Sequence, residues 1–138
     1  MDASLFIKQH HEIMTIAQEI IQALHQPSIS PDEAGALRSR LVNLSGKVIT
    51  HLAAEDNVLY PRLFSSNNIE VSRTAKEFAK EMGGIAEVFE GYIGSWTNGK
   101  TISERYPEFR SQSLAIFDKL ADRIDREENR LYRLANGL

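Results

Sequence analysis

Hydrophobic residues recur along four stretches of this chain at alternating spacings of three and four positions, with polar residues between them. This periodicity places the apolar side chains on one face of an α-helix, so each stretch is predicted to be an amphipathic helix. No stretch shows the alternation of apolar and polar residues that is typical of a half-buried β-strand. The predicted helices cover residues 6–24, 31–61, 71–96 and 107–136.

Residues that favour helix ends fall at the limits of these stretches. Ser30 is placed to cap the second helix, and Glu33 lies at the position that completes a capping box. Pro61 and the polar run at residues 65–68 are predicted to close that helix. Asn136-Gly137 is predicted to end the fourth helix.

Four long helices joined by short loops predict an all-α fold, namely an antiparallel up-down-up-down four-helix bundle. With 138 residues and no second hydrophobic pattern, the chain is expected to form a single domain over residues 1–138. Gly83 and Gly84 lie inside the third predicted helix and weaken it by about 1 kcal/mol each relative to alanine. A close helix approach, a local bulge and plainly tolerated glycines all remain open there.

Composition excludes several classes of site and partner. The chain has no cysteine, so any bound metal must be held by nitrogen and oxygen ligands. Its net charge of −3, with acidic and basic residues intermixed, predicts no nucleic-acid partner. No apolar run approaches the ~18 residues that a membrane span requires, and the N-terminus does not resemble a secretion signal. We therefore expect a cytoplasmic protein with no membrane partner.

His51 and Glu55 stand on the apolar face of the second predicted helix, where leucines would be expected. They are one helical turn apart, so their side chains project from the same face. Burying either group without a partner would cost several kcal/mol, which predicts a metal ion or a dense hydrogen-bond network around them. A structural ion pair between them is the alternative. The face comprises Leu37, Leu41, Leu44, Val48, His51, Glu55 and Val58.

Other unusual residues are predicted to lie at the same depth in the bundle. We counted residues from the loops that join neighbouring helices, at a rise of about 1.5 Å per residue. Each helix then has one or two ionisable or sulfur-bearing residues at a similar height along the bundle axis. These residues are His10, His51, Glu55, Met82, Arg123 and Glu127.

Four segments carry a resemblance to the hemerythrin-like (HHE cation-binding) family that spans nearly the whole chain. HHEIMTIAQEI resembles the family's first-helix histidine motif, and HLAAEDNVLYPRL is similar to its His-x-x-x-Glu motif with the trailing Leu-Tyr-Pro. RIDREENRLYRL is similar to its fourth-helix segment, and KEMGGI to the place of its third-helix histidine. The resemblance implies two irons that share two bridging carboxylates. The ligand positions retained here are His10, His51, Glu55 and Glu127.

Two of the family's histidine positions are not retained, because Met82 and Arg123 occupy them. This predicts a degenerate second metal site, with one iron ion favoured over two. Arg123, four residues before Glu127, is a candidate to replace the second ion as a cation tethered to the chain. A surface position for Arg123 is the alternative, and Met82 is either a core residue or a weak thioether ligand.

The neighbours of these residues are predicted to have supporting or surface roles. Tyr60 and Tyr132 follow the two carboxylate motifs and are candidates to hydrogen-bond to the ligands, or only to pack the end of the bundle. Asp56 and Glu128 are predicted to be solvated, although Glu128 competes with Glu127 for the inward direction. His11 is predicted to lie at the surface.

These features predict a metal-binding protein that senses, binds or buffers iron, dioxygen or nitric oxide, with a small gas or redox molecule as its partner. The alternative is a metal-free bundle that serves as a regulatory or protein-interaction module. An enzyme such as a ferroxidase is disfavoured, because the Glu-x-x-His pairs of di-iron bundles occur nowhere in the chain.

Overall fold

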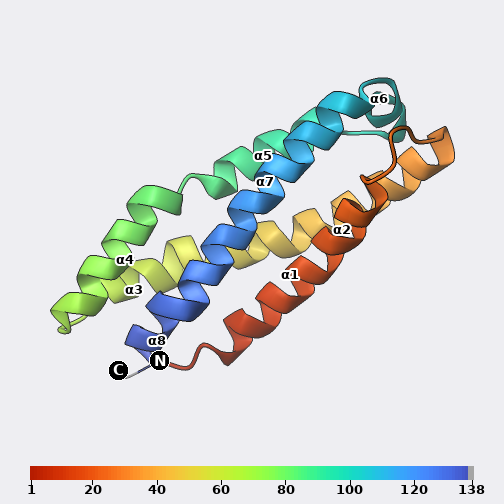
Figure 1. Cartoon of the computed structure of the whole chain (residues 1–138). Coiled ribbons are helices and arrows are strands. Elements are labelled where there is room, and N and C mark those ends of the chain that lie inside the picture. The colour runs from red at the N-terminus through yellow and green to blue at the C-terminus, as the bar shows by residue number, and fades with distance from the viewer. Residues whose placement is uncertain (137–138) are drawn as a thin grey trace.

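The computed structural model describes residues 1–136, and within them all regular secondary structure is helical. The helices form an elongated bundle in which the start of α1 and the short helix α8 lie at the same end (Figure 1). No helix in the described part of the chain has the length and hydropathy to cross a membrane. The elements in order are α1 Ser4–Ala23, α2 Pro31–Ala54, the π-helical turn η1 Glu55–Leu59, α3 Tyr60–Phe64, α4 Ile69–Met82, α5 Ile85–Ser95, α6 Gly99–Glu104, α7 Tyr106–Arg126, the π-helical turn η2 Glu127–Leu131, and α8 Tyr132–Ala135.

The start of α2 confirms the predicted capping box. The Ser30 hydroxyl accepts a hydrogen bond from the Glu33 backbone N–H at 3.1 Å, and the Ser30 N–H donates to the Glu33 carboxylate at 3.2 Å. Both interactions satisfy backbone groups that the first helical turn leaves unpaired. They fix the position at which the helix that carries His51 and Glu55 begins.

The prediction that Pro61 closes the second helix was wrong, because the helical path continues through η1 and α3 to Phe64. In η1 the Tyr60 N–H donates to the Glu55 carbonyl, five residues earlier rather than four. Pro61 follows in the first turn of α3, directly after the π-helical turn, and does not end the helix. The helix then ends at the polar run, as predicted.

Each π-helical turn also shifts which residues face the core. The predicted core residue Val58 is 63% exposed, whereas Leu59 is 4% exposed. The same shift follows η2, after which Ala135 is buried and Leu134 is only half-buried. A π-helical turn accommodates one extra residue, so the inward position moves by one residue beyond it. The last helix, α8, ends at Ala135 with Asn136 as its C-cap, and Gly137, the second residue of the predicted helix end, lies outside the described residues.

The helix predicted over residues 71–96 is divided into α4 and α5 by a turn at Gly83 and Gly84. A Cβ atom built on Gly83 would lie 2.4 Å from the Ala79 carbonyl oxygen, so only glycine fits this turn without movement. The short helix α6 was not predicted. It packs closely on α2, since a Cβ atom on Gly99 would lie 3.0 Å from the backbone nitrogen of Gly35.

The bundle has two unlike halves. α1 contacts α2 and α7, α2 also contacts α5 and α6, and α5 contacts α7. The half that contains α5, α6 and the start of α7 has an aromatic core, in which Trp96, Phe109 and Phe117 are essentially fully buried. The other half, at the end where α3, α4 and α8 lie in Figure 1, buries the ionisable residues.

Candidate metal centre

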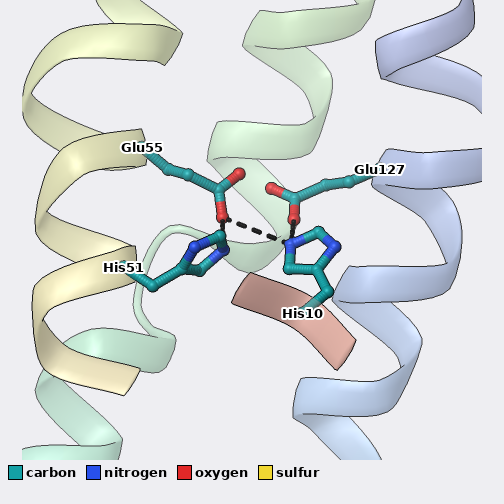
Figure 2. A group of neighbouring side chains, drawn as sticks. All are labelled: His10, His51, Glu55 and Glu127. Carbon is teal, nitrogen blue, oxygen red and sulfur yellow. Dashed lines mark ion pairs between the residues drawn. The ribbon is translucent and has the colours of Figure 1, made fainter. Parts of the chain in front are cut away.

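Four buried side chains from four helical elements converge inside the polar half of the bundle. His10 comes from α1, His51 from α2, and Glu55 and Glu127 are the first residues of the two π-helical turns. Figure 2 shows the two carboxylates and the two imidazoles pointing toward a common centre. One ligand atom from each of the four residues lies within 4.8 Å of the others, as required to hold a metal ion.

The atoms that face this centre lack the hydrogen bonds that buried polar atoms normally make. The Nε2 atom of His10 lies 3.3 Å from Glu127 Oε1 and 3.7 Å from Glu55 Oε1, and His51 Nε2 is in direct contact with Glu55 Oε1. His51 Nε2, Glu55 Oε1 and Glu127 Oε1 are buried and have no hydrogen-bond partner. Such unpaired groups require a cation or another partner among them.

The cavity beside these atoms is small. It has a volume of about 10 Å³ and is lined by His51, Glu55 and Glu127 together with Arg123 and apolar side chains. A volume of ~10–15 Å³ corresponds to about one water-sized sphere. The cavity is therefore about the size of a single water molecule.

Both imidazoles are held by their outer nitrogen atoms. His10 Nδ1 lies 2.8 Å from Glu128 Oε2, and His51 Nδ1 lies 2.6 Å from Gln9 Oε1. Because a carboxylate and an amide oxygen only accept hydrogen bonds, each ring must donate from Nδ1. A neutral ring in this state presents the lone pair of Nε2 to the centre, which is the arrangement of metal-binding histidines.

Two tyrosines donate hydrogen bonds to the outer oxygen atoms of the carboxylates, each tyrosine to the carboxylate of the other π-helical segment. Tyr60, which follows Glu55 in the chain, donates to Glu127 Oε2 at 2.6 Å, and Tyr132, which follows Glu127, donates to Glu55 Oε2 at 2.9 Å. Burial, with the nearby carboxylates, raises the pKa of both phenols, so they remain protonated donors. Each carboxylate therefore keeps Oε1 for the centre.

Arg123 is buried, with only 2% of its surface exposed, and it lies on one side of the site. Its guanidinium donates to Glu127 Oε2 at 3.2 Å, to Asp56 Oδ1 at 2.8 Å and to the Met82 carbonyl at 3.3 Å. Met82 is a buried core residue that reaches Arg123 through its backbone. Burial acts to lower the pKa of Arg123, but Glu127 and Glu55 outweigh it and raise that pKa. A permanent positive charge therefore lies beside Glu127.

The pKa values of the other ionisable groups of the site differ strongly from their usual values. Burial and the contact with Glu55 raise the pKa of Glu127 to about 7. Burial opposes ionisation of Glu55 as well, but contacts with Glu127, His10 and His51 hold its pKa well below the usual range. Burial acts to lower the pKa of His10, but Glu127 and Glu55 outweigh it and raise that pKa to about 10. The arrangement attracts positive charge, which a metal ion or a proton can supply.

The sequence model described as the hemerythrin HHE cation-binding domain matches residues 1–135. The chain belongs to the hemerythrin HHE cation-binding family. No curated protein and no solved structure matches the chain significantly. In this hemerythrin-family chain the four residues predicted to be ligands meet at one place, and Met82 and Arg123 contact each other beside it.

The prediction that Asp56 and Glu128 are merely solvated was wrong. Their side chains are 27% and 32% exposed, and each makes a short ionic contact, Asp56 with Arg123 and Glu128 with His10. Gln9, which holds His51, was not identified from the sequence. The predicted surface position of His11 is confirmed. A signal for the two acids was present, because Glu-Asp-Asn and Glu-Glu-Asn begin two similar segments, EDNVLY and EENRLY.

Proposed function

We propose that this protein binds a single metal ion, iron in the cell, through His10 Nε2, His51 Nε2 and the Oε1 atoms of Glu55 and Glu127. Two imidazoles with carboxylates form a donor set that suits non-haem iron. The observation that carries the proposal is the orientation of both imidazoles, whose Nδ1 atoms are held by Glu128 and Gln9. Three buried atoms at the centre then remain without a partner, as a bound ion would require.

One ion per chain is supported by charge and by space. Two bridging carboxylates around two divalent ions need nitrogen ligands for both, and Met82 and Arg123 supply none on the second side. The guanidinium of Arg123 already neutralises the outer side of Glu127 and contacts Asp56. The cavity of about 10 Å³ has room for one ion.

The proposed setting of this site is one hemerythrin-like domain, an antiparallel up-down-up-down four-helix bundle, in a cytoplasmic protein. The family match over residues 1–135 supports the single domain. The contacts of α1 with α2 and α7, and of α5 with α2 and α7, support the bundle arrangement.

The proposed role is to sense, bind or buffer iron, dioxygen or nitric oxide. A bound ion with open coordination positions would supply a place for such a small ligand. The protein's own groups would orient the ligand nitrogens, exclude bulk water and provide two phenol donors, those of Tyr60 and Tyr132, near the centre. Reversible oxygen carriage that needs two irons is not expected.

Metal analysis tests this proposal. Protein purified anaerobically with iron supplied, and never exposed to chelator, should contain close to one iron per chain. The His51→Ala variant should contain much less, whereas His11→Ala, at an exposed position on α1, should match the unmodified protein. Two ions per chain would contradict the single site. An equal iron content in all three proteins would contradict the assigned ligands.

A metal-free regulatory or protein-interaction module is the second candidate. It is favoured by the ion pairs that the site forms without a metal, since His10 Nε2 lies 3.3 Å from Glu127 Oε1 and Arg123 Nε lies 3.2 Å from Oε2 of the same carboxylate. The near-ultraviolet absorption of iron-supplied protein separates the two candidates. A band that changes with dioxygen or azide supports the metal site, and its absence supports the module.

A further inference from the structure

A surface pocket lies between α1 and α2, directly outside the candidate metal centre. Its volume is about 230 Å³, and it is lined from α1 by Gln9, Glu12 and Ile13 and from α2 by Gly46, Lys47 and His51. The site residues themselves are almost fully buried, so an ion or a small ligand must pass between side chains to reach them.

This pocket and the buried cavity share part of their walls. Ile13 and His51 line both of them. Three other surface pockets of the described residues share no lining residue with the cavity: one along α4 and the loop before it, one between α5 and α7, and one formed by α4, α5 and α7. The α1–α2 pocket is therefore separated from the centre by less protein than these three.

We propose that the α1–α2 pocket is the route by which metal ions and small ligands reach the centre. The inference rests on the proposed function. Gln9 lies at the inner end of this route, because it is half-buried, lines the pocket and accepts the hydrogen bond of His51 Nδ1 at 2.6 Å. A rotation of the Gln9 side chain releases His51, whose ring then turns and opens the wall between pocket and cavity.

The outer part of the route is closed only by a weak ion pair. Lys47 and Glu12 pair across it at 3.4 Å, and their side chains are 40% and 42% exposed. An exposed pair of this kind contributes little free energy, so it opens readily. Gly46 leaves the route unobstructed, since no atom lies within 4 Å of a Cβ atom built on it.

The rate of Co²⁺ uptake by the full-length, metal-free protein tests the route, because Co²⁺ absorbs visibly when nitrogen and oxygen ligands hold it. The Gly46→Leu variant should fill the pocket and slow both uptake and chelator-driven release by about tenfold, since binding then requires a further conformational change. The dissociation constant should stay unchanged, because both rates fall together.

The matched control is Gly91→Leu. Gly91 is also an exposed helical glycine with open space around its Cβ position, and it lines the α5–α7 pocket of about 260 Å³, which shares no residue with the cavity. This variant should take up Co²⁺ at the unmodified rate. Equal rates for the Gly46 variant, the Gly91 variant and the unmodified protein would overturn the proposed route while leaving the metal site itself in place.

A second pair of variants uses charge instead of bulk. Lys47→Glu places two carboxylates at the outer end of the route, and should accelerate Co²⁺ uptake in a salt-dependent way. Lys119→Glu makes the same change in net charge beside the α5–α7 pocket, and should have a much smaller effect. Equal acceleration by both variants would overturn the route. A failure of the unmodified protein to bind Co²⁺ would overturn both the route and the proposed function.

Discussion

The two oxygen atoms of each buried carboxylate make different interactions. In Glu55 and Glu127, Oε2 accepts a hydrogen bond from a tyrosine, and Oε1 faces the centre without a hydrogen-bond partner. The imidazoles follow the same rule, with Nδ1 held from outside and Nε2 directed inward. This division fixes the orientation of all four groups before any ion binds, which lowers the cost of ordering them on binding.

Replacing Gln9 should weaken metal binding through His51. The Gln9→Leu change removes the acceptor for Nδ1–H, so the ring loses the interaction that directs Nε2 to the centre. Loss of such a contact typically costs about 10–100-fold in metal affinity. Competition titration with a chromophoric chelator measures this change. Gln9→Glu keeps an acceptor oxygen and should retain most of the affinity, so equal losses in both variants would contradict the assigned role.

Replacing Arg123 should destabilise the protein even in the absence of metal. Arg123→Leu leaves Asp56 and Glu127 without their buried cation, and loss of one partner of a buried pair costs about 3–5 kcal/mol. Urea unfolding of the metal-free protein measures this loss. Arg126→Leu is the control, because Arg126 is 34% exposed and its ion pairs should contribute at most about 1 kcal/mol. Similar losses in the two variants would show that Arg123 does not act as a buried cation.

At the scale of elements, the π-helical turns explain why the sequence pattern did not predict which residues face the core beyond Glu55 and Glu127. Periodicity placed Glu55 and Glu127 inward correctly, because both lie at the end of regular α-helix. Tyr60, nine residues after His51, would point about 180° away from it in an uninterrupted α-helix. The turn at residues 55–59 changes that rotation, so Tyr60 becomes buried and Val58 exposed. The change departs from the period of 3.6 residues per turn on which the predicted helix faces were based.

Other features depended on tertiary contacts that no local pattern encodes. The Ser30 cap was predicted because its signal lies within four residues. The contact of Gln9 with His51 depends on how α1 is rotated against α2, and the ionic contacts of Asp56 and Glu128 depend on groups 67 and 118 residues away. Only the similarity of EDNVLY and EENRLY indicated that the two segments share a local structure.

The turn between α4 and α5 should tolerate alanine at one glycine and not at the other. Gly83→Ala brings Cβ to 2.4 Å from the Ala79 carbonyl oxygen, and should destabilise the protein by about 1–3 kcal/mol. Gly84→Ala meets no atom within 4 Å and has φ of −84°, so it should be neutral or stabilise by up to about 1 kcal/mol. Thermal unfolding of the two variants compares these effects. Equal stability would mean that α4 and α5 adjust freely at this turn.

At the scale of the whole molecule, the two halves of the bundle differ in what stabilises them. The aromatic half is held by apolar packing, with Trp96 also donating a hydrogen bond to Gln112 at 2.9 Å. The polar half buries two carboxylates, Arg123 and two imidazoles, and depends on balanced charge. Metal removal should therefore loosen the polar half and leave the aromatic half intact.

Metal should stabilise the folded chain by an amount that rises with the logarithm of the free ion concentration, and according to the ion's ligand preference. At a free Co²⁺ concentration 100 times the dissociation constant, the free energy of unfolding should rise by about 2.7 kcal/mol. Mg²⁺ at the same concentration should stabilise far less, because it prefers oxygen ligands and His10 and His51 offer nitrogen. Hydrogen exchange should show that the protection gained with Co²⁺ is concentrated in η1 and η2 rather than in α5 and α6. Equal stabilisation by the two ions would mean that the imidazoles take no part in holding the ion. Protection spread evenly over both halves would mean that metal binding does not act mainly on the polar half.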